Sequence, residues 1–463
     1  MLETLASHYR ISYYQLQNEK VIFMKDRDIK IILAFFCAVI LVFYGALSTA
    51  LRIFPYNILT SYLTVAEGVY SALDIENYNN EVRWTKPAIN NTGVLIHDQN
   101  RMQPGMTLFT STHDTTARLI DADGKIVHAW SFKFNDVWEN QDHIIALQHL
   151  PDKYFYLRDF HLYDNGDLLL MVSASGVTTW GMGLIKLDKD SHVLWKLTGY
   201  PNNDFEIGPD GTIYVIEHKI RETNLETVKL PILPFLEDNI LMLKPDGEVI
   251  KRVSLLDAID RSPYKDLLKQ IQEDEKGDPT HSNSLSYIKE DNPNVPWLRK
   301  GLIVISLRNI SSFLVFDPQK DEVVYASTLP TRMQHDLDYL PNGHFMVFDN
   351  RGSVTEGGYT RDMEFDPVTG QIYWLYDPPV GKDGLEFESD FWGGQHRLAN
   401  GNTLIIHAEA GRLLELTPEQ DVVWEYRAPL LKTIDGVPHT SIITAAERID
   451  PSRLGFLKQN EGQ

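Results

Sequence analysis

The stretch that decides the fold runs from residue 335 to residue 377. It holds four short segments in order: HDLDYL (335–340), HFMVFD (344–349), RDMEFD (361–366) and QIYWLYD (371–377). Pro341-Asn342-Gly343 separates the first two and Pro367 to Gly370 the last two, and both are combinations typical of tight turns. Apolar and polar side chains alternate within the segments, as they do in half-buried strands. The stretch therefore predicts an antiparallel meander of four strands.

The same order recurs along the chain. Other copies begin with GMTLFTS (105–111), FHLYD (160–164), DFEI (204–207), HSNSLSYI (281–288) and QHRLA (395–399). Six such units predict an all-β fold, a six-bladed β-propeller over residues 93–463. The opening unit lacks a clear first strand, which either Gly93 to Asp98 or the C-terminal His439 to Ala446 would supply. We expect the fourth-strand aromatics to pack between blades (Trp130, Trp195, Trp374, Trp424) and the charged insertion 257–278 to be helical.

An apolar segment precedes the repeats. Residues 31–51, IILAFFCAVILVFYGALSTAL, carry no charge and would cross a bilayer core as a helix. Basic residues are frequent before this span and rare just after it, which places residues 1–30 in the cytoplasm. We therefore expect a single-pass anchor at 31–52 in the cytoplasmic membrane, a linker with a short amphipathic helix at 53–92, and the propeller in the periplasm or outside the cell. A cleaved signal peptide is the competing interpretation.

Composition narrows the functional classes. The chain of 463 residues has a formal net charge of −21, which disfavours a nucleic-acid partner, because such a protein needs a basic face. The single cysteine, Cys37, excludes an intrachain disulfide and a cysteine-based metal cluster. No P-loop, glycine-rich nucleotide turn or carboxylate group with metal-ligand spacing is present, so neither a cofactor nor a metal is expected.

A propeller would bring distant histidines together. First-strand starts and second-strand ends lie at one end of a propeller, and these positions hold His281, His335, His439, His113, His218, Arg308, Arg351 and His407. A single strand histidine is more often structural, but this many at one rim indicates a site. Neutral imidazoles act as nucleophiles and bases near pH 7, and guanidiniums hold anionic oxygens. The combination suits transfer of a sulfuryl or phosphoryl group.

These residues resemble those of the bacterial aryl-sulfate sulfotransferases, which are periplasmic six-bladed propellers. The resemblance covers about residues 93–457 and is strongest in THSNSLSYI (280–288), SLRNISSFLVFD (306–317), MQHDLDYLPNGHFMVFDNRG (333–352) and NGNTLIIHAEAGRLLEL (400–416). It implies ping-pong transfer from an aryl sulfate to a phenol through a sulfohistidine, without phosphoadenylyl sulfate.

The resemblance also implies residue roles. His281, His335 and Arg351 would hold the sulfate oxygens and move the phenolic proton. His407 would be the nucleophile, with His396 as the alternative, and Arg308, Asn283 and His396 would bind substrate. A non-catalytic, membrane-anchored propeller that binds a partner remains the alternative function, since a fold does not determine an activity.

Overall fold

The computed structural model describes residues 26–51, 80, 82–85, 91–146, 149–177, 179–230, 233–271, 277–351, 359–378 and 387–460. It divides into two compact units, residues 1–70 and 71–463. The predicted linker helix near 57–74 and most of the predicted cytoplasmic segment lie outside the described residues.

The first unit contributes one helix, α2 (Asp26–Leu51). It coincides with the apolar segment, and eight large apolar side chains on it are exposed, from Phe35 to Leu47. Of the residues that are described, no helix meets the length and apolarity needed to span a membrane.

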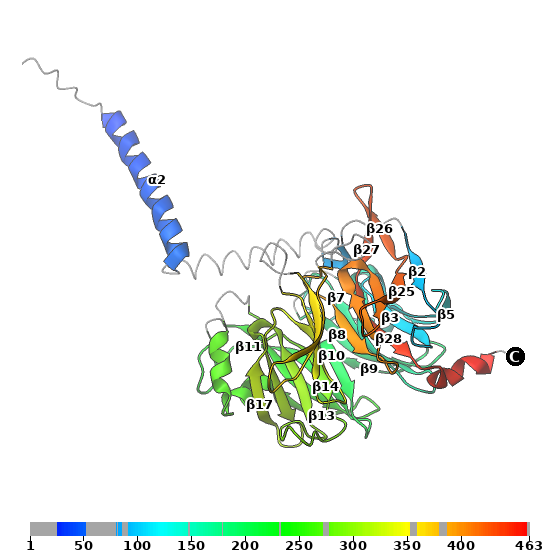
Figure 1. The fold of residues 1–463 in the computed structure, drawn as a ribbon. Coiled ribbons are helices and arrows are strands. Elements are labelled where there is room, and N and C mark those ends of the chain that lie inside the picture. The colour runs from blue at the N-terminus through cyan, green and yellow to red at the C-terminus, as the bar shows by residue number, and fades with distance from the viewer. Residues whose placement is uncertain are drawn as a thin grey trace, which may run out of the picture. The chain divides into compact units, whose positions relative to one another are not determined.

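The second unit is built from antiparallel sheets (Figure 1). Six of the sheets in its described part have four or five strands. Three of them are formed by β28 (Ile443–Ile449), β3 (Met106–Ser111), β4 (Thr116–Ile120) and β5 (Ile126–Ser131); by β6 (Phe155–Leu162), β7 (Leu168–Ala174), β8 (Gly181–Leu187) and β9 (Val193–Thr198); and by β10 (Pro201–Ile207), β11 (Ile213–Arg221), β12 (Phe235–Leu243) and β13 (Val249–Ser254).

The other three large sheets repeat this meander. They are formed by β14 (Ser282–Tyr287), β15 (Ile303–Leu307), β16 (Ser312–Asp317) and β17 (Glu322–Thr328); by β18 (His335–Tyr339), β19 (Phe345–Asp349), β20 (Arg361–Phe365) and β21 (Ile372–Tyr376); and by β22 (Gly394–Arg397), β23 (Thr403–His407), β24 (Arg412–Leu416), β25 (Val422–Arg427) and β2 (Gly93–His97). A smaller sheet joins β1 (Trp84–Thr85), β27 (Val437–Ser441) and β26 (Leu431–Ile434).

Short helices connect the strands, except for the last one, which follows β28. They are α5 (Phe134–Val137), η1 (Asp152–Tyr154), α6 (Leu255–Asp260), η2 (Lys265–Gln270), η3 (Arg308–Ile310), η5 (Ala408–Ala410) and η6 (Pro451–Asn460). Helices α6 and η2 occupy the insertion that the sequence predicts to be helical. Ser254 caps α6 by accepting a hydrogen bond from the backbone N–H of Asp257.

The C-terminal strand completes the opening unit, which settles the alternatives for its first strand. β28 pairs with β3 from Ile443↔Ser111 to Ile449↔Met106, whereas β2 is added to the edge of β25 as a fifth strand. The strand begins later than the sequence predicts, so His439 belongs to β27 instead, where it is half-buried and its Nδ1 lies 3.0 Å from the carbonyl oxygen of Val437. The prediction that His439 joins the rim histidines is therefore wrong.

The six large sheets are linked in a cycle through their first strands and, in the last sheet, also β23. β6 contacts β10, β10 contacts β14, β14 contacts β18, β18 contacts β22, and β28 contacts both β23 and β6. The predicted all-β architecture of four-stranded units is confirmed, and its arrangement is propeller-like.

The outer-strand tryptophans pack against the neighbouring sheets, as predicted. The indole N–H groups of Trp130, Trp374 and Trp424 donate to the carbonyls of Gly166, Pro418 and Ala122, at 3.0, 3.2 and 2.9 Å. Gly247 lies against the ring of Trp195 and has no room for a side chain there. Trp130 and Trp424 are fully buried, so each contributes a large apolar area to the core between sheets.

A β-bulge recurs near the start of five of the first strands. The register shifts lie between Leu157 and Asp159, Pro201 and Phe205, Ser282 and Ser284, His335 and Asp338, and Ile443 and Ala445. A bulge redirects the side chain of the extra residue and is common beside functional sites. Here it turns polar side chains towards the adjacent first strand.

These redirected side chains and Gln395 on β22 form hydrogen bonds between neighbouring first strands. They are Thr444 Oγ1 to Leu157 O (2.7 Å), Arg158 Nη2 to Asn203 Oδ1 (2.6 Å), Asn203 Nδ2 to Ser282 O (2.8 Å), Asn283 Nδ2 to Gln334 O (2.7 Å) and Gln395 Nε2 to Asp336 O (2.6 Å). These hydrogen bonds fix the starts of the first strands relative to one another, and several predicted site residues lie there.

Candidate functional site

The starts of β14 and β18 carry the two central histidines. His281 immediately precedes β14, and His335 is the first residue of β18. Arg308 begins η3, directly after β15. The charge of Arg308 acts on both imidazoles, and His281 also acts on His335, so the three side chains lie within electrostatic reach of one another. The structure thus brings together three of the predicted site residues.

The hydrogen bonds of His335 define its tautomer. Its Nδ1 lies 2.8 Å from Asn350 Oδ1 and 3.2 Å from the carbonyl oxygen of Met333. Asn350 Nδ2 donates to the carbonyls of Ser389 and Trp392, at 2.7 and 3.0 Å, which orients its Oδ1 towards the imidazole. Both neighbours of Nδ1 are acceptors, so Nδ1 carries the hydrogen. The lone pair is then on Nε2, for which no hydrogen-bond partner exists among the described residues.

Burial and positive charge favour the neutral form of His335. Only 5% of the residue is exposed. Burial, Arg308 and Arg158 together hold the pKa of His335 well below its ordinary value, although the hydrogen bond to Asn350 acts in the opposite direction.

His281 is oriented by a carboxylate. Its Nδ1 lies 2.5 Å from Asp278 Oδ2, so Nδ1 donates to the carboxylate and Nε2 is available to accept a proton. Burial lowers the pKa of His281, while the charge of Asp278 partly compensates. His281 has φ = 46°, an uncommon conformation for a residue with a side chain, which places the ring off the regular strand direction.

A buried ion pair supports this region from the neighbouring sheet. His218 Nε2 and Asp238 Oδ1 are 3.0 Å apart, and both side chains are fully buried. Burial disfavours charge on His218, but the hydrogen bond to Asp238 and the negative charges of Asp238 and Asp278 together outweigh it and raise the pKa of His218. Asp238 Oδ2 accepts hydrogen bonds from Thr280 Oγ1 and the backbone N–H of Ser282, at 2.7 and 2.8 Å. The pair therefore fixes the two residues on either side of His281.

A second guanidinium enters from β6. Arg158 is the extra residue of a bulge, and its charge acts on His335 and His218. Burial lowers the pKa of Arg158 to about 10, which still leaves it charged at neutral pH. Two positive groups, Arg158 and Arg308, thus accompany neutral His335, and this is a suitable environment for an anion.

Two half-buried tryptophans lie beside these charged groups. The Trp180 ring centroid is 5.8 Å from that of His218 and 6.1 Å from that of His281. The guanidinium carbon of Arg158 is 3.6 Å from the centroid of Trp392. The site therefore combines anion-binding groups with aromatic surfaces.

Two predicted site residues have other partners. His407 ends β23, where its Nε2 lies 2.9 Å from the carbonyl oxygen of Glu388 and its ring centroid 4.9 Å from that of Phe387. Arg351 follows β19, and its Nη1 is 3.8 Å from Asp377 Oδ2. None of the contacts described for either residue reaches His281 or His335.

The remaining predicted residues are dispersed. Asn283 lies on β14 beside His281 and donates to the carbonyl of Gln334. His396 lies on β22, with Nδ1 3.8 Å from Asp338 Oδ2. His113 pairs with Asp114 at 2.8 Å, near the end of β3.

The sequence analysis missed Arg158, Asn350, Trp180 and Trp392. Arg158 could have been found from the sequence. The first strand of its unit, extended backwards from FHLYD, includes Arg158, which has the same position in that strand as Asn203 and Asn283 have in the first strands of their units. Trp392 lies in the segment before β22, outside the repeating pattern, so the repeat could not reveal it.

Two groups of described side chains bring three potential metal ligands within 4.8 Å of one another. One consists of His218, Asp238 and Asp278, and the other of Asp336, Asp338 and His396. His218, Asp238 and Asp278 are far apart in the sequence, and His396 is far from Asp336 and Asp338, so the sequence shows neither complete set of ligands.

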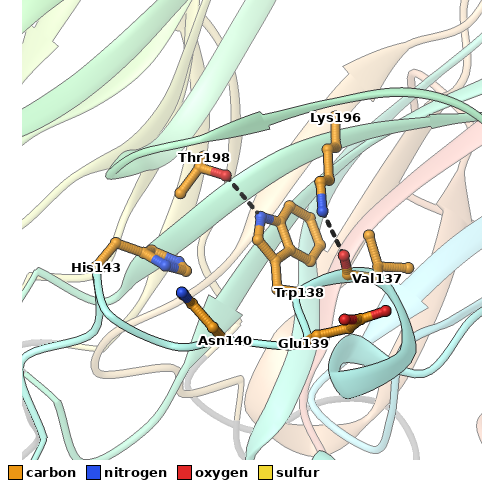
Figure 2. Close-up of a pocket in the computed structure, with 7 residues that line it drawn as sticks. All are labelled: Val137, Trp138, Glu139, Asn140, His143, Lys196 and Thr198. Carbon is orange, nitrogen blue, oxygen red and sulfur yellow. Dashed lines mark hydrogen bonds between the residues drawn. The ribbon is translucent and has the colours of Figure 1, made fainter.

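A separate pocket of about 300 Å³ lies between α5 and β9 (Figure 2). Trp138 Nε1 donates to Thr198 Oγ1 at 2.9 Å, and the Lys196 ammonium donates to the Val137 carbonyl. His143 Nε2 lies 3.1 Å from the Met182 carbonyl oxygen, and burial lowers the pKa of this histidine. The polar groups of this pocket largely engage their own surroundings and include none of the predicted site residues. The cluster around His335 is therefore the better candidate.

The all-β, propeller-like framework carries two neutral imidazoles and two guanidiniums, a combination suited to binding an anion. The chain belongs to the arylsulfotransferase (ASST) family, whose model matches residues 159–429, more than half of its length. Family membership supports a transferase. No curated protein sequence matches the chain.

Solved structures resemble the chain only distantly. A protein of unknown function from Bacteroides caccae is 14% identical over 74% of this chain and 98% of its own, with a TM-score of 0.45. Virginiamycin B lyase from Staphylococcus aureus is 11% identical over 74% of this chain and 87% of its own, with a TM-score of 0.39. A streptogramin B lyase is 14% identical over 77% and 88%, also with a TM-score of 0.39. Likeness at this level carries no inference about activity.

Proposed function

We propose that the protein transfers a sulfuryl group from an aryl sulfate to a phenolic acceptor, with His335 as the nucleophile. The observation that carries this proposal is the hydrogen bond from His335 Nδ1 to Asn350, which leaves a lone pair on Nε2 of a ring on which the charges of Arg308 and Arg158 act. We further propose that the six large sheets are the blades of a six-bladed propeller, with the site at one end of its axis.

The first half-reaction forms a sulfohistidine. His335 Nε2 attacks the sulfur, the bond from sulfur to the aryl oxygen breaks, and the phenolate leaves with that electron pair. Arg308 and Arg158 hold the sulfuryl oxygens as charge shifts to the leaving oxygen. The Nδ1–H of the substituted imidazole keeps its hydrogen bond to Asn350, which stabilises the positive charge on the ring.

The second half-reaction returns the group to a phenol. The acceptor oxygen attacks sulfur, the sulfur–nitrogen bond breaks, and Nε2 regains its lone pair. His281 Nε2 takes the phenolic proton, with Asp278 stabilising the imidazolium. His281 then delivers that proton to the leaving phenolate of the next donor, so protons balance over the cycle. Trp180 and Trp392 provide surfaces for the aryl rings.

Mass spectrometry of the covalent intermediate tests this assignment. The full chain, purified in detergent, is mixed with 4-nitrophenyl sulfate and its intact mass is measured. We expect one added sulfuryl group, mapped by peptide analysis to His335. His335→Ala should lose both the adduct and 4-nitrophenol release, whereas His407→Ala should keep the adduct.

Two outcomes contradict the proposal in different ways. An adduct on His407 or His396 would reject His335 as the nucleophile and retain the activity. No adduct and no turnover with a panel of aryl sulfates, in a protein with a native circular dichroism spectrum, would favour the non-catalytic, partner-binding alternative.

We also propose that residues 31–52 anchor the protein in the cytoplasmic membrane, with the sheets on the outer side. The uncharged sequence, the helical conformation of α2 and its exposed apolar side chains support this location.

Labelling of Cys37 tests the anchor. Cys37 is the only cysteine and is exposed on α2. A membrane-impermeant maleimide should label it in the denatured protein and not in intact membranes. Equal labelling in both, or release of the protein by alkaline carbonate, would contradict an anchor.

A further inference from the structure

A group of carboxylates lies beside the candidate site and takes no part in the proposed chemistry. Asp336 and Asp338 on β18 and His396 on β22 bring one ligand atom each within 4.8 Å of one another. All three residues are only half-buried, so solvent reaches them. We call these three residues the β18–β22 cluster.

A fourth carboxylate, on β20, is buried next to this cluster. Asp362 is completely inaccessible to solvent, and neither of its side-chain oxygens has a hydrogen-bond partner among the described residues. The strand register pairs Asp362 with Phe348 and Phe348 with His335, which puts Asp362 on the face of the sheet that carries His335. Asp336 acts electrostatically on Asp362, and Asp362 acts on Asp338. A buried carboxylate without a partner is costly unless a proton or a cation compensates it.

Negative charge around the cluster exceeds the positive charge that faces it. Asp336 also acts on Asp159 and Asp204, and Glu206 acts on Asp338. The cationic groups that act on these carboxylates are His396, Lys289, Arg158 and Arg397. Arg397 is already paired with Glu364, at 2.8 Å.

We propose that the β18–β22 cluster binds a divalent cation, with Asp336, Asp338 and His396 as ligands. Two carboxylates and one imidazole offer both oxygen and nitrogen ligands. This set suits Mn²⁺ better than Ca²⁺, because Ca²⁺ is typically bound by oxygen ligands alone. The bulge at Asp336 places its carboxylate next to that of Asp338, and Gln395 holds it by donating a backbone N–H to Asp336 Oδ2 at 2.7 Å. The cation would neutralise the cluster and lock β18 to β22, and it has no role in the sulfuryl-transfer steps above.

Mn²⁺ binding to the full chain in detergent tests this site. The protein is first dialysed against EDTA, then titrated with Mn²⁺ while free Mn²⁺ is followed by electron paramagnetic resonance. We expect one bound ion per chain and a higher thermal unfolding midpoint. Asp338→Asn and His396→Ala should each weaken binding at least tenfold, whereas Glu419→Gln, which removes an exposed carboxylate outside the cluster, should leave binding unchanged.

Thermal unfolding without metal shows whether the variants are folded, so that a loss of Mn²⁺ binding is not mistaken for a loss of structure. Metal-free Asp338→Asn loses a repelling charge, so its midpoint should equal or exceed that of the metal-free wild type, and Mn²⁺ should no longer raise it. Stoichiometric binding that Asp338→Asn and His396→Ala leave intact would locate the ion elsewhere and overturn the proposal. Absence of Mn²⁺, Zn²⁺ and Ca²⁺ binding would overturn it as well and would indicate that protons alone neutralise these carboxylates.

Discussion

Asn350 Oδ1 accepts a hydrogen bond of 2.8 Å from Nδ1 of His335, and the nitrogen of the same amide donates to the carbonyls of Ser389 and Trp392. One buried side chain therefore sets the tautomer of the proposed nucleophile and fastens the segment that carries an aromatic surface of the site. This connection joins β19 to the residues before β22.

Asn350→Ala should lower kcat about tenfold to a hundredfold, because the loss of one buried hydrogen-bond partner costs on the order of 1 to 3 kcal/mol. His335 would then populate both tautomers, and only the Nδ1–H form presents the Nε2 lone pair. Steady-state kinetics with 4-nitrophenyl sulfate measures the effect. Asn402→Ala, which removes a buried asparagine on a different strand end, is the control. A kcat equal to that of the control would show that Asn350 does not orient the nucleophile.

Arg158→Lys should raise KM for an aryl sulfate about tenfold and change kcat less. Lysine keeps the charge but loses the planar stacking on Trp392, 3.6 Å away, and the second donor for sulfuryl oxygens. The comparison is with Arg453→Lys, a partly exposed arginine that pairs with Asp164 and Glu447. The proposed role of Arg158 fails if both variants leave KM unchanged.

The repeating pattern was sufficient to predict the sheets but not the whole site. Turn residues and alternation are local features, so the six meanders and the outer-strand tryptophans could be predicted from them. His281, His335 and Arg308 were found because strand ends in different units meet. Strand ends do not determine side-chain direction, however. His407 has the predicted position at the end of β23, yet its ring engages Glu388.

Side chains redirected by bulges are harder to predict. Arg158 and Asp336 depend on an extra residue in one strand of a pair, which alternation alone does not reveal. Asn350 and Trp392 depend on contacts between segments about forty residues apart in the sequence. No local pattern encodes such a contact, and this explains why the orienting amide and one aromatic surface were missed.

Gly393→Ala should destabilise the protein much more than Gly370→Ala. Both glycines have positive φ, 140° and 72°, so alanine adds backbone strain of about 1 kcal/mol at each position. At Gly393 a Cβ would also lie 2.1 Å from the ring of Phe348, whereas nothing lies within 4 Å at Gly370. Overpacking of this kind costs about 1 to 3 kcal/mol more. Thermal unfolding of the two variants measures the difference. Equal shifts of the unfolding midpoint would contradict the close packing of Gly393 against Phe348 on β19.

Glu409 should make the protein less stable as the pH rises from about 4.5 to 7. Burial raises the pKa of Glu409 to about 7, although its carboxylate accepts the backbone N–H groups of Asp390 and Phe391. The folded state therefore binds more protons than the unfolded state between these pH values, and stability falls over this range and levels off above pH 7. The contribution is at most about 3.5 kcal/mol, since one pKa unit corresponds to about 1.4 kcal/mol.

Glu409→Gln removes this titration and should flatten that part of the stability profile. Glutamine keeps only one of the two acceptor oxygens, so its NH2 group faces one backbone N–H and the variant should lose one hydrogen bond at every pH. Its stability should therefore stay level from pH 4.5 to 7, whereas that of the wild type falls. Unfolding midpoints measured across the pH range test this, with Glu419→Gln as an exposed control whose profile should follow the wild type. A parallel profile for Glu409→Gln would mean that Glu409 is ionised throughout and that its two backbone hydrogen bonds outweigh its burial.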